Sequence, residues 1–158
     1  LAVAQVSVLD NMESFGLDKY VRFHPGLFNE SLPKYYTRNQ QRGIRRQVAV
    51  LRIDGNFYES YMDALYYMWE FVPVGGFIIF DDLNFRSDLK AQGEGDPWAD
   101  FKARHKLTER LLAIDWTASF FRKVSDVPVN WNWYKQDRGA GKAFVMKRRR
   151  KSVDQINI

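Results

Sequence analysis

Residues 48–60 read V-A-V-L-R-I-D-G-N-F-Y-E-S, and residues 73–83 read P-V-G-G-F-I-I-F-D-D-L. Val48–Ile53 and Phe77–Phe80 are short, mostly apolar runs, which are typical of buried strands. A helical pattern over Tyr58–Val72 connects them. A strand, a helix and a strand within so short a stretch form a βαβ unit, so we expect two parallel strands with a right-handed crossover. The sequence therefore predicts an α/β fold.

The connecting helix is identified by its apolar period. Five residues step by four, three, four and three positions and so share one helical face: Tyr58, Met62, Leu65, Trp69 and Val72. Asn56 is the expected N-cap, and Glu59 lies favourably in the first turn. Pro73 is expected to stop the helix, because the residue before a proline avoids the α region. We expect Leu65 and Trp69 to be buried against the strands.

Carboxylates follow both strands. Asp54 comes directly after the first strand, and Asp81 and Asp82 come directly after the second. Neighbouring strands lie about 4.8 Å apart, and open α/β sheets bind ligands at the carboxyl ends of their strands. Converging carboxylates repel one another unless a cation or a proton joins them, and oxygen ligands suit Mg²⁺. We therefore predict a metal site at Asp54, Asp81 and Asp82. The alternative is that the three residues only cap helices and form turns.

These motifs resemble the macrocin O-methyltransferase family. Its pattern is an R-(hydrophobic)-D-G-D-(hydrophobic)-Y-E-S-T-M-D-A-L run followed by P-G-G-(aromatic)-V-I-V-D-D-Y. The match to L-R-I-D-G-N-F-Y-E-S-Y-M-D-A-L is ungapped, and the resemblance covers roughly residues 10–123. The flanking segments that agree are residues 15–17, 21–23, 26–28, 32–33, 114–117 and 121–123.

The resemblance implies a fold, an activity and cofactors. The implied fold is the Rossmann-like fold of class I methyltransferases. The implied enzyme is a metal-dependent O-methyltransferase that uses S-adenosylmethionine and Mg²⁺. Its implied partner is a small-molecule hydroxyl acceptor, such as a sugar. The alternative that we keep open is a non-catalytic, methyltransferase-like remnant that serves as an interaction module.

The resemblance also implies two candidate catalytic residues. Asp54 falls on the first aspartate of D-G-D and is interpreted as a metal ligand and a candidate base. Asn56 falls on the second aspartate, which in the family lies close enough to the acceptor to be a candidate proton acceptor. An amide cannot accept a proton near neutral pH. We therefore expect Asn56 to lower the activity if the second position supplies the base.

The segments that hold S-adenosylmethionine in such folds are not recognised in this chain. They are a Gly-rich turn after the first strand and an acid after the second, so the cofactor-binding residues are unknown. We predict about five strands where the implied fold has about seven. Residues 1–123 are thus expected to be the carboxyl-terminal half of the domain, without its first two strands. Three alternatives stay open: the sequence is a fragment of a longer chain, the protein has lost its cofactor half, or another chain, such as a second copy, supplies that half.

The composition is that of a single soluble domain. The chain has 158 residues, a net charge of +5 and no cysteine, which excludes disulfides and thiolate metal sites. No apolar run reaches the ~20 residues needed to span a bilayer, and no signal peptide is recognised. We expect no membrane association and favour a cytoplasmic location.

Three elements are predicted near the amino terminus. Residues 1–15 are expected to form a helix that ends at Gly16. Val21–His24 alternates and is predicted to be a short strand. His24 is either catalytic or, as we favour, a surface residue, and His105 is also interpreted as structural. Lys34–Gln47 is interpreted as a polar connector. Its arginines either contact phosphates or, as we favour, are solvated: Arg38, Arg42, Arg45 and Arg46.

Further elements follow the acidic pair. Leu83–Gly95 is a candidate lid over the site. Asp96 and Pro97 are expected to start a helix as N-cap and first residue. Leu111–Asp115 and Ala118–Lys123 are predicted to be closing strands. The helix should direct two side chains inward: Trp98 and Phe101.

Residues 124–158 are predicted to form an aromatic and basic extension. The basic run covers Arg138–Lys151, and the aromatic cluster comprises Trp131, Trp133 and Tyr134. Basic and aromatic residues together are typical of nucleic-acid or acidic-partner binding. We favour a solvated tail or docking segment instead. As a docking segment it suits the remnant interpretation.

Overall fold

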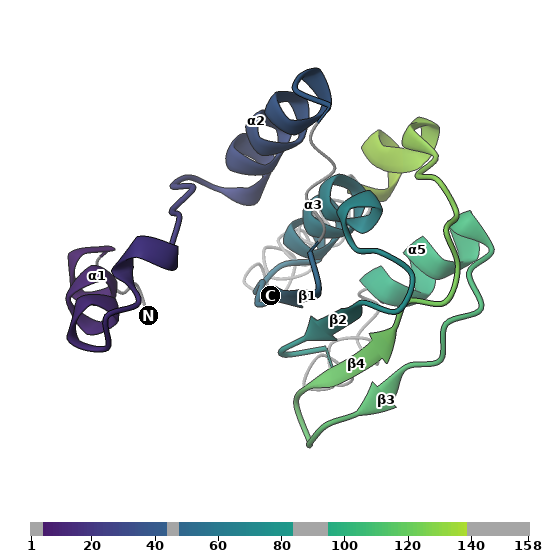
Figure 1. The fold of residues 1–158 in the computed structure, drawn as a ribbon. Helices are drawn as coiled ribbons and strands as arrows, with labels where there is room; N and C mark the ends of the chain where they lie inside the picture. The colour runs from purple at the N-terminus through teal and green to yellow at the C-terminus, as the bar shows by residue number, and fades with distance from the viewer. Residues whose placement is uncertain (1–4, 44–47, 84–94, 139–158) are drawn as a thin grey trace, which may run out of the picture.

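A parallel pair of strands joined by a helix forms the centre of the structure (Figure 1). β1 (Val50–Ile53) runs parallel to β2 (Phe77–Phe80), with Val50 opposite Phe77. α3 (Tyr58–Met68) makes the crossover between them. The predicted βαβ unit and the adjacency of its strands are confirmed. The structure is a computed structural model, and the parts of the chain that it describes are residues 5–43, 48–83 and 95–138.

Two further strands complete a four-stranded sheet with the order β1-β2-β4-β3. β4 (Ser119–Arg122) is antiparallel to β2, and β3 (Leu112–Ala113) is antiparallel to β4. The two predicted closing strands are thus confirmed. The turn between them forms because Asp115 Oδ1 accepts hydrogen bonds from the backbone N–H groups of Thr117 (2.8 Å) and Ala118 (2.7 Å).

The sheet is buried on one face only. Ile78, Phe80 and Phe121 belong to the core, whereas Val50 and Phe77 on the opposite face are 54% and 39% exposed. The expectation of buried strands therefore holds for one face, which α3 and α5 both cover (Figure 1). The apolar run alone does not distinguish burial on one face from burial on two.

α3 is buried along the face that its apolar period predicts. The five residues of the predicted apolar face are at most 3% exposed, although Trp69 and Val72 lie beyond the end of α3. A 3-10 turn, η2 (Trp69–Phe71), continues the helix towards Pro73. The predicted N-cap is wrong, because Phe57 rather than Asn56 occupies that position and makes no side-chain capping bond. Tyr58 fixes the first turn instead, since it is buried and its hydroxyl donates to Asp100 Oδ2 (2.8 Å).

α5 (Pro97–His105) begins as its sequence predicts. Asp96 Oδ1 accepts hydrogen bonds from the backbone N–H groups of Trp98 (3.0 Å) and Ala99 (3.1 Å). Trp98 is buried and stacks on Phe121 of β4 with ring centroids 4.2 Å apart. α5 is thereby attached to the sheet beside α3. Of the candidate lid between Leu83 and Gly95, residues 84–94 lie outside the described residues.

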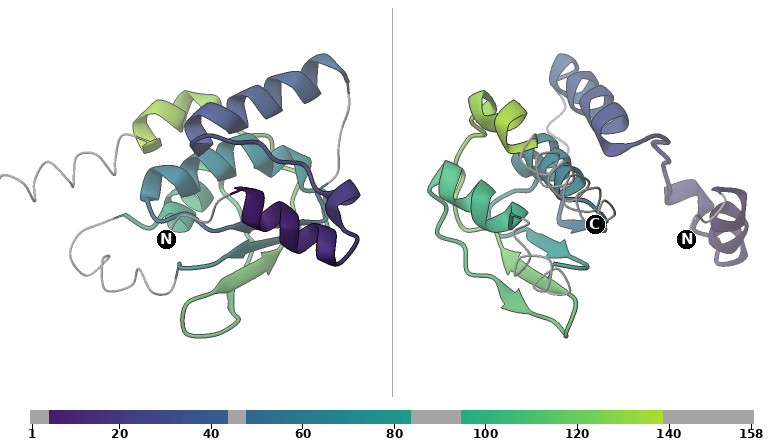
Figure 2. Two further views of the ribbon diagram at one scale, coloured as in Figure 1. Left: turned by 90° about the vertical axis from the view of Figure 1, so that its left-hand side faces the viewer. Right: turned by 180° about the vertical axis from the view of Figure 1, so that it is seen from behind.

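The amino-terminal helix forms as predicted but stands apart from the sheet (Figure 2). α1 (Gln5–Ser14) has no buried residue, and Gly16 follows it with a φ of 65°. A short 3-10 turn, η1 (Asp18–Tyr20), leads on from it. The predicted strand Val21–His24 is wrong, because this segment pairs with no strand among the described residues. Alternation specifies an extended backbone, but a strand also needs a partner edge.

Most of the described part of the segment interpreted as a polar connector is helical. α2 (Phe28–Gln41) continues through Pro33 and packs on the outer side of α3 (Figure 1). Its polar sequence lacks a continuous apolar stripe, which is why the pattern did not predict it. Tertiary contacts hold it, because the rings of Tyr35 and Tyr36 both meet Phe71 edge-on. Arg45 and Arg46 lie outside the described residues.

The described residues beyond the closing strands pack on α3. A 3-10 turn, η3 (Trp131–Trp133), contains part of the predicted aromatic cluster. Tyr134 Oη donates to Asp63 Oδ1 (2.6 Å), and Arg138 Nε donates to the same oxygen (2.9 Å). The rest of the basic run, residues 139–151, lies outside the described residues. Among the described helices, none is both long enough and apolar enough to cross a bilayer.

Candidate metal centre

Three carboxylates gather where β1 and β2 end. Asp54 follows β1 and Asp81 follows β2, and they lie opposite each other because Ile53 pairs with Phe80. The backbone N–H of Asp81 donates to Ile53 O (3.0 Å), so strand pairing continues to the acidic residues. One carboxylate oxygen from each of Asp54, Asp81 and Asp82 lies within 4.8 Å of the other two. The structure thus brings all three predicted metal ligands together.

The donor set suits a hard cation. All three donors are carboxylate oxygens, which Mg²⁺ and Ca²⁺ prefer. From their bond lengths, oxygens on opposite sides of the ion lie about 4.2 Å apart for Mg²⁺ and up to about 5.2 Å apart for Ca²⁺. Separations of up to 4.8 Å lie within the Ca²⁺ span and slightly beyond the Mg²⁺ span. Asp54 is exposed and the other two are half-buried, which leaves an open side for water or an acceptor oxygen.

Arg52 is the residue at this site that the sequence analysis missed. Its guanidinium donates to Asp81 Oδ1 from Nη2 (2.7 Å) and from Nε (3.2 Å). Nη2 also lies 3.7 Å from Asp54 Oδ2. Arg52 and Asp54 are two positions apart on an extended strand, so their side chains leave the same face. That spacing was the available signal.

Partial burial and neighbouring charge perturb the pKa of Asp54. Partial burial at the sheet edge and then the carboxylate of Asp81 raise this pKa, while the guanidinium of Arg52 opposes them. Such a shift is expected when carboxylates share a site. A divalent ion placed between the carboxylates would favour their charged forms. The electrostatics therefore support cation binding at this point.

The second candidate catalytic residue lies beside this group. Asn56 is exposed, two residues beyond Asp54, and it follows the buried Gly55. A Cβ at Gly55 would lie 3.0 Å from Ser60 Cβ, so the turn from β1 into α3 packs closely here. This close turn keeps Asn56 at the same end of the sheet as Asp54. Its catalytic role stays a prediction.

The two histidines have different surroundings. His24 is exposed, with its ring edge-on to Tyr35 at 5.1 Å. His105 is buried in α5, where Nδ1 lies 2.9 Å from Phe101 O and Nε2 accepts from the backbone N–H of Asn130 (3.0 Å). Burial lowers the pKa of His105. This geometry fits a neutral ring with its proton on Nδ1, so His105 has a structural role.

Comparison with known proteins gives this site a context. The profile of the family described as macrocin-O-methyltransferase (TylF) matches residues 1–123. The 8-demethyl-8-(2,3-dimethoxy-alpha-L-rhamnosyl)-tetracenomycin-C 4'-O-methyltransferase of Streptomyces olivaceus is 35% identical over 126 residues, which are 79% of this chain and 43% of that protein. The demethyldecarbamoylnovobiocin O-methyltransferase of Streptomyces niveus is 32% identical over 125 residues, 78% of this chain and 43% of that protein.

A solved structure agrees with these relatives. The O-methyltransferase NovP matches with a TM-score of 0.66 and 32% identity, over 79% of this chain and 47% of that chain. This likeness confirms the predicted Rossmann-like methyltransferase fold. The chain spans less than half the length of these relatives. The part of them that it represents, and the division of the chain at residue 123, stay predictions.

Proposed function

Because the chain belongs to the macrocin O-methyltransferase family, we propose that it supplies the metal-binding and acceptor-binding part of an O-methyltransferase. The proposed methyl donor is S-adenosylmethionine, the proposed ion is Mg²⁺, and the proposed acceptor is a hydroxyl of a sugar or a related small molecule. The convergence of Asp54, Asp81 and Asp82 supports this proposal. It lies at the carboxyl end of the parallel strands, where α/β sheets bind ligands.

The residues of the proposed site have separate roles. Asp54, Asp81 and Asp82 would hold the ion, which supplies positive charge that lowers the pKa of a bound hydroxyl. Because Asn56 cannot take a proton near neutral pH, Asp54, which is exposed at the edge of the site, is the proposed proton acceptor of this chain. General-base help of this kind typically contributes 10²–10⁴-fold to the rate. The chain's other contribution is alignment of the acceptor. We assign no residue to the methyl donor.

Titration of Mg²⁺ by calorimetry tests the proposal. Asp81→Asn removes one charged ligand and should weaken binding at least about tenfold, since even the loss of partners behind a ligand costs 10–100-fold. Asp10→Asn makes the same chemical change on the exposed α1, away from the site, and should leave the affinity unchanged. Equal affinity of Asp81→Asn and the unaltered chain would place any metal elsewhere.

One observation favours a second candidate function. Asn56 stands where the family resemblance calls for a carboxylate, and it cannot take a proton near neutral pH. The second candidate is therefore a non-catalytic member of the family that acts as an interaction module. Retained Mg²⁺ binding without methyl transfer in the complete protein would favour it over the enzyme.

A further inference from the structure

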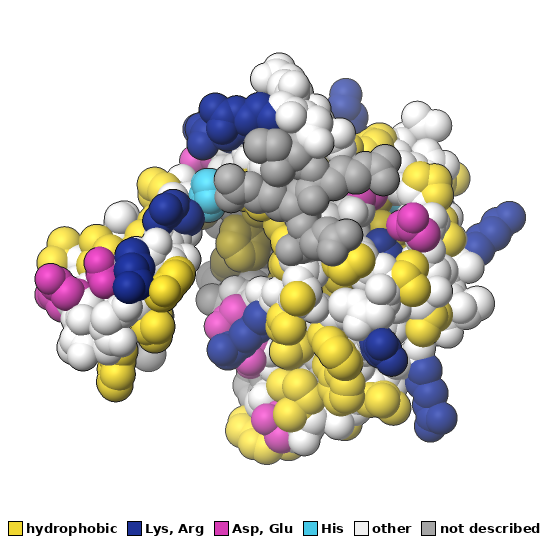
Figure 3. Space-filling view, in the orientation of Figure 1, with side chains coloured by type: hydrophobic (Ala, Val, Ile, Leu, Met, Phe, Trp, Pro, Cys, Tyr) yellow, Lys and Arg dark blue, Asp and Glu magenta, His cyan; other side chains and the backbone are white. Residues whose placement is uncertain are grey.

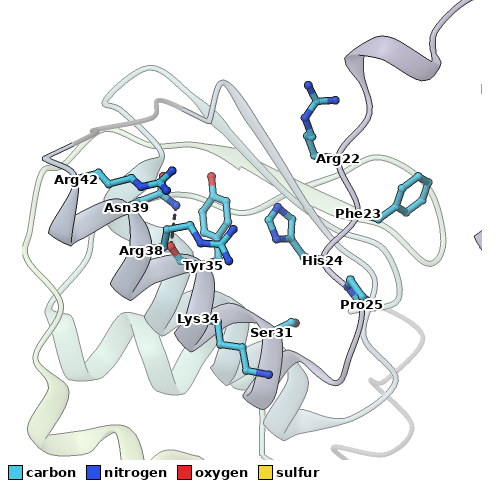
Figure 4. Close-up of a pocket in the computed structure, with 10 residues that line it drawn as sticks. All are labelled: Arg22, Phe23, His24, Pro25, Ser31, Lys34, Tyr35, Arg38, Asn39 and Arg42. Carbon is cyan, nitrogen blue, oxygen red and sulfur yellow. Dashed lines mark hydrogen bonds between the residues drawn. The ribbon is translucent and has the colours of Figure 1, made fainter.

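A second concave site lies between α2 and the extended segment that precedes it (Figure 4). The cleft has a volume of about 450 Å³, which is within the range of small-ligand pockets. One wall is α2 and the other is Arg22–Pro25. The residues that line it are Arg22, Phe23, His24, Pro25, Ser31, Lys34, Tyr35, Arg38, Asn39 and Arg42.

Positive charge gathers on both walls of this cleft. Lys34, Arg38 and Arg42 are spaced by four residues, so they form one stripe along α2. Arg22 belongs to the other wall, although its guanidinium points away from α2 (Figure 4). Figure 3 shows Lys and Arg side chains gathered over α2. None of the lining residues is acidic.

The four cations lack acidic partners in the described part of the chain. No described carboxylate oxygen lies within 4.0 Å of the charged nitrogens of Arg22, Lys34, Arg38 or Arg42. Arg22 Nη1 donates only to backbone carbonyls, those of Val21 (2.9 Å) and Lys19 (3.3 Å). Like charges four residues apart destabilise a helix. The C-terminal dipole of α2 favours Arg38 and Arg42, but it does not explain the arginine on the facing wall.

We propose that this cleft binds a small organic diphosphate. The stripe from Lys34 to Arg42 extends roughly 12 Å along the helix at 1.5 Å per residue, which exceeds the reach of a single phosphate. A guanidinium group can bind two oxygens of a phosphate through two parallel hydrogen bonds, and Arg38 and Arg42 supply two guanidinium groups. The limited volume of about 450 Å³ favours a small molecule over a nucleic-acid strand, which needs an extended groove. This site is independent of the proposed metal centre.

Calorimetric titration of the full 158-residue chain with inorganic pyrophosphate tests the proposal. The double variant Arg38→Gln/Arg42→Gln should bind pyrophosphate at least about tenfold more weakly, because each charge-assisted contact contributes that order. Arg110→Gln/Lys135→Gln is the matched control. Both residues are exposed and lie outside the cleft, and the two substitutions remove the same amount of charge as the cleft variant. Orthophosphate should bind more weakly than pyrophosphate.

Four results would overturn the proposal. The first is that pyrophosphate shows no measurable binding, and the second is that orthophosphate binds as tightly as pyrophosphate. The third is that the cleft variant and its control weaken binding equally, which would mean only general charge attraction. The fourth is binding of a single-stranded oligonucleotide by a chain that ignores pyrophosphate, which would assign the cleft to nucleic acid. Circular dichroism of the double variant shows whether α2 persists. Retained helix with lost binding supports the proposal.

Discussion

Lys123→Met is expected to destabilise the fold strongly. Lys123 lies just after β4, and its side chain is fully buried. Its Nζ donates to Trp69 O (3.0 Å) and to Val72 O (2.8 Å), and it lies 4.4 Å from the centre of the Trp69 ring. These carbonyls belong to η2 and its C-cap. Trp69 O also accepts a hydrogen bond from the backbone N–H of Val72 (3.2 Å). The ammonium therefore ties the end of the crossover to the sheet.

The magnitude follows from the two carbonyls. Val72 O loses the donor that Lys123 supplies, whereas Trp69 O keeps the backbone N–H of Val72. Leaving one buried acceptor without its partner costs about 1–3 kcal/mol. One effect opposes this loss, because burial lowers the pKa of Lys123 and so disfavours its charged form in the fold. Methionine fills a similar volume without that penalty. We therefore expect a net loss of about 1–3 kcal/mol, a substantial share of the 5–15 kcal/mol typical of native proteins.

Urea unfolding followed by tryptophan fluorescence measures this loss. Lys135→Met is the matched control, because Lys135 is exposed and surface changes usually stay within about 0.5 kcal/mol. If Lys123→Met unfolds within that margin of the control, the two carbonyls find other donors or water, and the reasoning is refuted. A change in the slope against urea would instead point to altered compactness.

Two further predictions concern single side chains. Because burial lowers the pKa of His105 from 6.5, the unfolded chain takes up a proton before the folded chain does. The free energy of unfolding should therefore fall as the pH drops below about 6.5, and His105→Gln should flatten that slope; an equal slope would contradict the neutral ring. Asn56→Asp should speed methyl transfer to hydroxylated sugars in the complete protein, towards the 10²–10⁴-fold worth of a base. A variant no faster than an active parent would leave Asp54 as the proton acceptor.

The sequence predicted correctly those helices whose capping residue or apolar periodicity lies within the helix's own sequence. The buried apolar face of α3 was predictable because its residues recur at the helical period. The start of α5 was predictable because Asp96 makes its capping bonds within three residues. The same local patterns failed where the deciding contact is distant in sequence. α2 depends on Phe71, and a strand at Val21–His24 would depend on a partner edge.

The acidic group was predictable for a topological reason. When two parallel strands are neighbours, the residues that follow them lie at the same edge of the sheet, whichever residue types they are. Arg52 was harder to predict, because an arginine within a strand indicates only that one face is polar. Its partner Asp81 lies 29 positions further along the chain. Only the register of β1 against β2 brings the two side chains together.

Arg52 also determines how the metal experiment should be understood. Its guanidinium already offsets part of the repulsion among the carboxylates, so the fold does not depend on an ion to hold the strand ends together. Binding of a divalent cation would replace one positive charge with a larger one. In Asp81→Asn the preferred acceptor of Arg52 loses its charge, which leaves Asp54 as the nearer anion for the guanidinium. The variant would then lose a ligand and face a competing cation at Asp54, and both effects weaken Mg²⁺ binding while the sheet stays intact.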